Sequence, residues 1–256
     1  MKVVVMSRRR PNVCAKGSHK IFPSALVSIG EDDVDSYKKA GIPGKNLLIH
    51  PKEVVGICPS RNWILDNIEE ETLVIVDDDC KGIACIVGER DVPARMIKEE
   101  KSIMMIFETL EQGAKEIGTG YFGIGRIGLD DRKFSPFNSF QFVGYSNSVH
   151  GIIGREFRFD EDNMVNDDID FCLRMIRRYR VIFLDNRYSY VPMASTRRMA
   201  GGATSFLTKK RDKMERMKVK KRWGKYYQLG KWKFGEVTSR ICVERKQKGL
   251  ITPDML

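Results

Sequence analysis

Three consecutive aspartates, Asp77 to Asp79, come directly after an apolar run, LVIV at 73–76, that is typical of a buried strand. Adjacent carboxylates repel one another, so an acidic triplet here indicates a positive partner. In α/β sheets, ligands bind at the carboxyl ends of strands. Asp77 and Asp79 would offer two carboxylates to a hard cation, Mn²⁺ or Mg²⁺, that also holds a diphosphate. The alternative is a solvated acidic turn.

A second acidic stretch, NDDID at 166–170, stands at the start of a predicted helix. The helix dipole favours carboxylates at this end, so capping by Asn166 and dipole matching are one explanation. In the other, Asp168 faces a cleft and acts as a general base for an incoming hydroxyl. The residues alone leave both readings open.

Basic residues near the amino terminus can balance this acid. Arg8, Arg9 and Arg10 follow the first predicted strand, and Arg61 lies at the start of a predicted helix. Arginine beside a helix amino terminus suits a phosphate group. The alternative for the arginine run is a solvated basic loop.

The positive charge of the chain is concentrated in one segment. The net charge is +11, yet residues 209–248 hold sixteen Lys or Arg against four acids, a net of +12, which leaves about −1 elsewhere. Aromatic residues are interleaved with these cations, which suits phosphates and stacked bases. A plain solvated face is the alternative. The candidates for nucleic-acid contact are Lys220, Lys221, Arg222, Trp223 and Lys225.

Other sites are not indicated. The six cysteines form no C-x-x-C pair and the three histidines have no ligand spacing, so neither a zinc site nor a disulfide framework is expected. GIGRIG at 123–128 fits the dinucleotide pattern literally, but it follows a predicted helix instead of a strand. No segment approaches 18 apolar residues, so we expect no membrane contact and a cytoplasmic location.

The elements that must position these residues alternate between strand and helix, which predicts an α/β fold with a largely parallel sheet. A long helix is expected from Ala94 to Ile117, and FQFVGY and HGIIG are expected as antiparallel edge strands. The glycine-rich stretch 195–206 has the composition of a mobile loop or lid. The other expected strands are 2–6, 25–30, 47–50, 73–76 and 181–185, and the other expected helices start near Asp32, at Ser60 as N-cap, and after Asn166.

Taken together, these residues resemble a known family. A strand ending in Asp-x-Asp, followed some ninety residues later by DDIDFCLR, looks like a GT-A glycosyltransferase. More narrowly, SRRRP, SYKKAGIP, HPKEVVGICPSRNWILD and IVDDDC, in this order over about residues 1–200, resemble the TET-associated glycosyltransferases of bacteriophages. That resemblance implies a three-layer α/β/α sandwich with a mainly parallel central sheet, here with a basic C-terminal extension.

The resemblance also implies residue roles. Asp77 and Asp79 match the metal-binding Asp-x-Asp, and Asp78 would contact the ribose or sugar of the donor. Asp168 matches the second acid of the x-E-D motif, the base of inverting members, although Asp167 replaces the usual glutamate. The positions that match basic residues around the nucleotide are Arg8, Arg10 and Arg61, and Gly144 to Gly154 matches a loop at the donor sugar. No histidine follows His150, so the one that completes the metal shell in many GT-A enzymes has no counterpart.

We therefore expect a catalytic domain at 1–206 and a DNA-contacting segment at 207–256. The predicted reaction moves a sugar from a UDP-sugar to the hydroxyl of 5-hydroxymethylcytosine, or another hydroxymethylpyrimidine, in DNA, with Mn²⁺ or Mg²⁺. Two alternatives remain: a metal-dependent nucleotidyltransferase or nuclease that uses the same aspartates, and a non-catalytic DNA-binding module. Sequence does not indicate the sugar, the stereochemical outcome or the oligomeric state.

Overall fold

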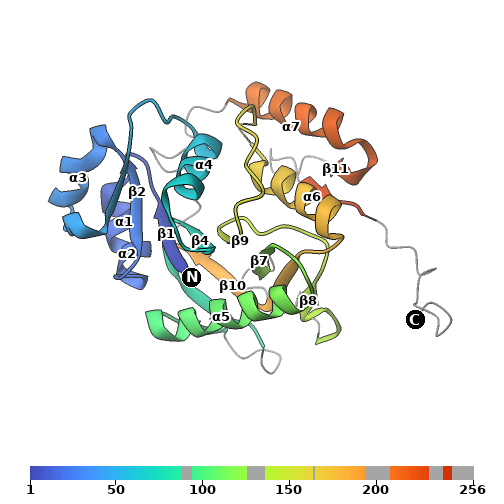
Figure 1. The fold of residues 1–256 in the computed structure, drawn as a ribbon, viewed down its shortest axis with the longest axis horizontal. Coiled ribbons are helices and arrows are strands. Elements are labelled where there is room, and N and C mark those ends of the chain that lie inside the picture. Colours follow the sequence, from blue (N-terminus) through green and yellow to red (C-terminus); the bar gives the residue numbers. More distant parts are fainter. Residues whose placement is uncertain (88–93, 126–135, 164, 194–207, 231–238, 244–256) are drawn as a thin grey trace.

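The computed structural model describes residues 1–87, 94–125, 136–163, 165–193, 208–230 and 239–243 (Figure 1). Its helices are α1 (Pro11–Lys16), α2 (Ser18–Ile21), α3 (Val34–Lys39), α4 (Ile57–Asn67), α5 (Glu100–Glu116), α6 (Asp167–Tyr179) and α7 (Lys209–Trp223). The strands are β1 (Lys2–Met6), β2 (Leu26–Gly30), β3 (Leu47–His50), β4 (Thr72–Asp77), β5 (Cys80–Cys85), β6 (Arg95–Ile97), β7 (Tyr121–Gly125), β8 (Phe140–Gln141), β9 (Val149–Ile153), β10 (Phe183–Pro192), β11 (Tyr227–Leu229) and β12 (Ser239–Ile241).

One mixed sheet runs through the molecule in the order β3-β2-β1-β4-β9-β7-β10-β5-β6, with β8 paired to β10. The first four strands are parallel, and β7 and β10 are parallel to each other. The prediction of an α/β fold with parallel central strands is therefore confirmed. Strand β9 joins the two parallel groups, since it pairs with both β4 and β7, and it is antiparallel to each of them.

Side-chain alternation along the central strands builds a core on each face of the sheet. Val74 and Val76 of β4 pack with α1, α2, α3 and α5, whereas Leu73 and Ile75 pack with α4 and α6. Figure 1 shows α5 on one side of the strands, with α4 and α6 on the other. The expected three-layer α/β/α sandwich follows from this alternation.

Three local predictions were wrong. The expected helix from Ala94 to Ile117 is instead β6 followed by α5, because residues 95–97 pair with β5. The HGIIG segment is not at an edge but at the sheet centre, where Gly151 leaves room for the Phe122 ring. Ser60 does not cap α4 but lies inside it, and its Oγ donates to the Gly56 carbonyl at 2.7 Å.

The C-terminal elements pack on α6. Val219 of α7 and Tyr227 of β11 are buried against Ile169 and Leu173 of α6. Strands β11 and β12 form a small antiparallel sheet of their own beside them. In the part of the chain that the structure describes, no helix is long and apolar enough to cross a membrane.

Candidate functional site

The acidic triplet lies in the turn between β4 and β5, beside the end of β1. Ser7 follows β1, and its Oγ donates to Asp78 Oδ2 at 2.6 Å. Tyr37 of α3 hydrogen-bonds the same Ser7 oxygen at 2.6 Å, and its own hydroxyl accepts from the Arg10 backbone N–H at 3.2 Å. The Arg10 guanidinium lies 3.1 Å from Asp78 Oδ1. Asp78 is thus tied on both oxygens to the loop that follows β1.

Asp79 is less completely paired. Its side chain is 1% exposed, and its Oδ1 accepts a 2.5 Å hydrogen bond from the Tyr190 hydroxyl of β10. Its Oδ2 lies 3.8 Å from Arg10 Nη2 and has no hydrogen-bond partner among the described residues. A buried carboxylate oxygen with no donor is costly, so this atom has bonding capacity for a ligand.

Burial of this triplet is electrostatically unfavourable. Desolvation raises the pKa of Asp77 to about 7, and the neighbouring Asp79 contributes to the same shift. Desolvation also raises the pKa of Asp78 to about 6, against the opposing effects of Ser7 and Arg10. The pKa of Asp79 is raised by burial too. The charged forms are therefore under-compensated, as expected of a cluster that is completed by a cation.

The backbone of the turn is held rigidly. Ser18, at the start of α2, donates its Oγ to the Asp77 carbonyl at 2.5 Å and accepts from the Cys80 N–H at 2.8 Å. On the other side, the Met193 N–H donates to the Asp79 carbonyl at 2.8 Å. These bonds fix the backbone from which the three carboxylates project. Sequence reasoning missed Ser7, Ser18 and Tyr190, since each comes from an element far away in the chain.

The second acidic stretch begins α6, on the α4 face of the sheet. Asp167 forms an ion pair with Arg61, whose buried guanidinium also lies 4.9 Å from the centre of the Phe159 ring. Arg61, predicted at the nucleotide, is thus engaged by Asp167 in this structure. Asp168 is half-buried, and its Oδ1 accepts from the Ile169 N–H at 2.8 Å. Arg8, also predicted at the nucleotide, lies half-buried in the loop after β1.

A divalent cation fits the strand end in part. The available donors are the carboxylates of Asp77 and Asp79, which are the hard oxygen ligands that Mg²⁺ and Mn²⁺ prefer. Among the described residues, no group of three or more His, Cys, Asp or Glu side chains is placed to hold a metal. His150 is not such a ligand, because its ring is buried and bonded to Tyr121 and the Asn147 carbonyl.

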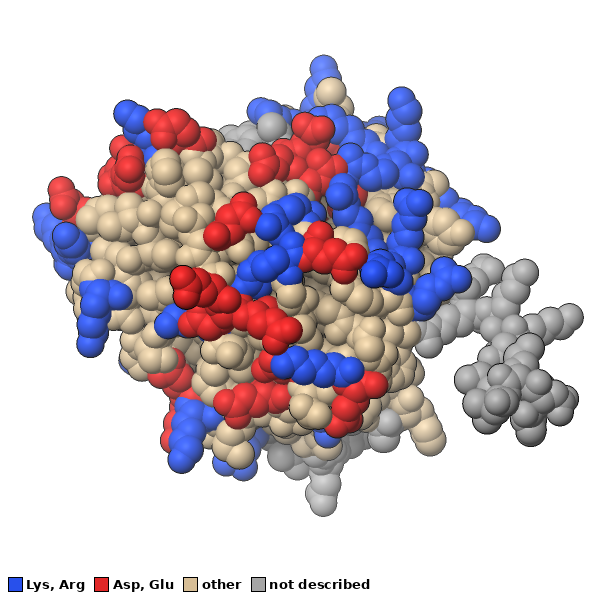
Figure 2. All heavy atoms as spheres, viewed as in Figure 1, with Lys and Arg blue, Asp and Glu red and all other residues tan. Residues whose placement is uncertain are grey.

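The five DNA-contact candidates differ in their surroundings. Lys220 donates to the carbonyls of Gly224 and Tyr227 at 2.6 and 2.7 Å. Arg222 and Trp223 hold Asp170, with the Trp223 indole N–H at 2.7 Å. Lys221 and Lys225 are exposed. Figure 2 shows Lys and Arg gathered at the upper right of this face, over α7.

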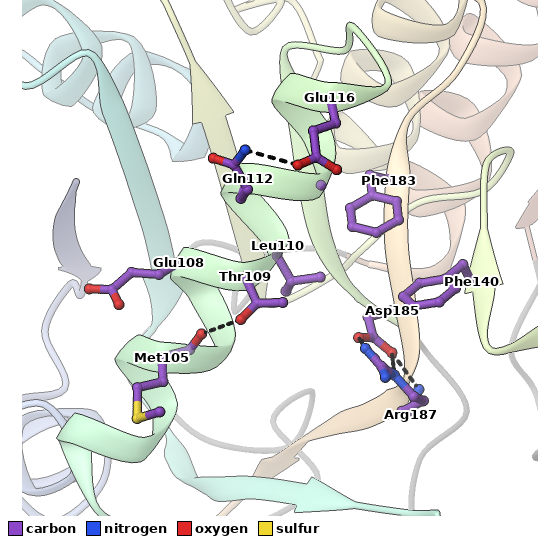
Figure 3. A pocket seen from close by; sticks show the side chains of 11 residues that line it. Met105, Glu108, Thr109, Leu110, Gln112, Glu116, Phe140, Phe183, Asp185 and Arg187 are labelled. Atoms are coloured by element: carbon purple, nitrogen blue, oxygen red, sulfur yellow. Dashed lines mark hydrogen bonds and ion pairs between the residues drawn. The ribbon is translucent and has the colours of Figure 1, made fainter.

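A separate pocket of about 530 Å³ lies between α5 and β10, on the opposite face of the sheet from α6 (Figure 3). Phe140 and Phe183 stack at 5.3 Å, and the Arg187 guanidinium covers Phe140 while it pairs with Asp185. Arg187 and Asp185, which line the pocket, pair with each other, and none of the lining residues belongs to the acidic site. The predicted lid at 195–206 lies outside the described residues.

Fold and site together define an α/β protein with an acidic cluster at the carboxyl end of β4. The family model of the TET-Associated Glycosyltransferase matches residues 1–202. The chain therefore belongs to this family and is a glycosyltransferase. No curated protein matches the chain.

Solved structures give remote likenesses. TarS residues 1–349 of S. aureus in complex with UDP-GlcNAc is 13% identical, with a TM-score of 0.46 over 86% of this chain and 67% of that one. The match to a longer TarS structure covers 40% of that chain. Glucosyl-3-phosphoglycerate synthase from Mycobacterium tuberculosis, in complex with Mg²⁺ and UDP, is 10% identical, with a TM-score of 0.44 over 94% of this chain and 87% of that one. At these TM-scores the likenesses carry no weight for donor or metal.

Proposed function

We propose that this glycosyltransferase moves a sugar from a UDP-sugar to the hydroxyl of 5-hydroxymethylcytosine, or of another hydroxymethylpyrimidine, in DNA. The observation that carries the proposal is the under-compensated acidic turn, in which Asp79 Oδ2 is buried and has no hydrogen-bond donor among the residues that the structure describes. Membership of the family supports sugar transfer. The cation-rich segment around α7 supports a nucleic-acid acceptor.

Asp77 and Asp79 would hold Mn²⁺ or Mg²⁺ at the end of β4. When bound, that ion would stabilise the negative charge of the departing diphosphate. Arg8 and Arg10 add positive charge on the same side of the sheet. Asp78 keeps acceptor capacity beyond its bonds to Ser7 and Arg10, and would contact the ribose or sugar.

Asp168 would take the proton of the acceptor hydroxyl as a general base. It stands at the start of α6, where the Arg61–Asp167 ion pair ties this helix to α4. Arg61 would hold α6 through this pair, and it stays the predicted basic residue on the nucleotide side, where it lowers the pKa of Asp77. The DNA would lie along the exposed cations Lys221 and Lys225.

The test is a donor screen. Purified protein is incubated with Mn²⁺, DNA that contains 5-hydroxymethylcytosine and a panel of UDP-sugars, and the nucleosides are measured by mass spectrometry. We expect a gain of one sugar mass that Asp79→Asn abolishes and that Asp66→Asn, a change at an exposed surface pair, preserves. Release of UDP without modified nucleoside would exclude this acceptor. No turnover of any UDP-sugar would exclude the proposed donor.

A further inference from the structure

The residue before the acidic pair of α6 has an unusual backbone. Asn166 is the N-cap of α6, but its φ and ψ are 56° and 30°, in the left-handed region. An N-cap residue is normally extended, with its side chain bonded to the first turn. The Asn166 side chain makes no such bond. A left-handed conformation in a non-glycine residue persists only where its surroundings hold it.

The C-terminal segment supplies that hold. Asn166 Nδ2 donates to the Tyr227 hydroxyl at 2.5 Å and to Ser239 Oγ at 3.2 Å. Asn166 Oδ1 accepts from Arg216 Nη1 at 3.1 Å. Both polar atoms of the side chain are therefore bonded to α7, β11 and β12, between 50 and 73 residues further along the chain.

The three partners also hold one another. Arg216 Nη1 donates to Ser239 Oγ at 2.6 Å, and Ser239 Oγ lies 2.8 Å from the Tyr227 hydroxyl. Arg216 is 5% exposed and Tyr227 is fully buried. A closed hydrogen-bond network in a buried setting is strong and directional. We call Arg216, Tyr227 and Ser239 the Asn166 clamp.

Asp168 lies between this clamp and a second attachment. On one side of it, Asp167 is paired with Arg61 of α4. Two residues beyond, Asp170 accepts from Arg222 at 3.0 Å and from Trp223 at 2.7 Å. The first turn of α6 is thus held from α4 and twice from α7 and the strands that follow it. The clamp residues all lie beyond residue 202, where the match to the family model ends.

We infer that the C-terminal segment positions the general base: Arg216, Tyr227 and Ser239 are positioning residues that hold the start of α6 so that Asp168 meets the acceptor hydroxyl. The inference rests on the proposed function, in which Asp168 is that base. Small errors in the placement of a catalytic group are costly, and about 1 Å can cost about 100-fold in rate. The segment therefore acts on the chemical step as well as on the binding of DNA.

Tyr227→Phe tests this directly, because it removes the hydroxyl and keeps the buried ring. We expect kcat for sugar transfer to fall about 10- to 100-fold, with KM for the UDP-sugar and for DNA within about twofold of the wild type. The matched control is Tyr179→Phe, which removes a hydroxyl bonded to Glu156 at 3.1 Å near the other end of the same helix. Its kcat should stay at the wild-type value.

A second variant guards against simple loss of folding. Asn166→Gly keeps access to the left-handed backbone and removes only the side chain. It should lower kcat to a similar degree, and the double variant with Tyr227→Phe should be no slower than the slower single variant, because both break one network. Circular dichroism and thermal unfolding then confirm that each variant is folded at the assay temperature.

The outcomes separate the two proposals. If the wild-type enzyme modifies no hydroxymethylated DNA, the proposed function fails. If the wild type is active and folded Tyr227→Phe keeps the wild-type kcat, the positioning role is wrong. A rise in KM for DNA with unchanged kcat would also overturn it, since the segment would then serve acceptor binding alone.

Discussion

Two buried acidic clusters of this protein differ in how their charge is balanced. In the α6 cluster, Asp160 and Asp170 meet Arg174, Arg222 and the indole N–H of Trp223. In the strand-end cluster, Asp77 to Asp79, a single guanidinium, that of Arg10, forms ion pairs among the described residues. The α6 cluster is saturated, whereas the strand-end cluster has raised pKa values and a buried oxygen that no donor reaches within the described part of the chain.

The difference indicates two roles for buried carboxylates. A saturated cluster stabilises the packing of α7 on α6, and removal of one partner leaves the other unpaired. An unsaturated cluster costs folding free energy, which is typical of a site that is completed by a ligand. Both clusters are built from aspartates, so only their partners separate the two roles.

The largest expected effect is on catalysis at the strand end. Asp79→Asn keeps the oxygen that accepts from Tyr190 but removes the charge. We expect kcat/KM for sugar transfer to fall by at least about 100-fold, which is about 2.7 kcal/mol of transition-state stabilisation. Urea unfolding should show unchanged or slightly higher stability. A fall in the free energy of unfolding of about 2 kcal/mol or more, as expected when a buried pair is broken, would show that this cluster is structural. That result would contradict the comparison.

In the α6 cluster the main effect should be on stability. Asp170 is 1% exposed, and Asp170→Asn weakens its charged bonds to Arg174 and Arg222. We expect the free energy of unfolding to fall by about 1–3 kcal/mol in urea titrations. Asp66→Asn, at a pair that is exposed on both sides, should change it by less than about 0.5 kcal/mol. Equal effects of the two changes would contradict a saturated buried cluster.

Metal addition should distinguish the two clusters by a smaller effect, on thermal stability. At about five times its Kd, Mn²⁺ bound to the folded state adds about 1 kcal/mol of stability, which raises Tm by about 2–4 °C for a chain of this size. EDTA should reverse the shift in thermal unfolding. Asp79→Asn should lose the shift and Asp170→Asn should keep it. A shift that survives in Asp79→Asn would place the ion elsewhere.

The smallest effect concerns the surface of α7 and of the turn that follows it. Lys221 and Lys225 are exposed, whereas Lys220 is bonded to two backbone carbonyls. Lys221→Gln and Lys225→Gln should each weaken DNA binding modestly and lower the slope of log K against log salt by about 1. Fluorescence anisotropy at several salt concentrations measures this. Lys39→Gln, an exposed change on α3, is the control and should leave the slope unchanged.

Much of the parallel half of the fold is predictable from the sequence. The expected strand boundaries at 2–6 and 47–50 match β1 and β3, and the apolar run before Asp77 is β4. Such runs are local patterns, and the strand–helix alternation around them leaves few parallel topologies. The same pattern predicted that the aspartates end a strand, which they do.

The mixed half was less predictable. The helix expected from Ala94 to Ile117 exists as α5, but the prediction extended it over residues 95–97, whose pairing with β5 depends on a partner elsewhere in the chain. The place of β9 between β4 and β7 depends on Gly151 and on the Phe122 ring that packs against it. A strand pattern specifies an extended backbone and not its neighbours.

For the site, the sequence by itself determined which residue types are available: an acidic triplet at a strand end, an acidic helix start and a basic C-terminal segment. Tertiary structure alone decided that Tyr190 bonds Asp79, that Arg61 is engaged by Asp167, and that Trp223 packs inward on Asp170. These contacts join residues between 53 and 111 positions apart. A periodic pattern reports on residues that are close in sequence. The compensation of a buried charge depends instead on the groups that the complete fold brings beside it.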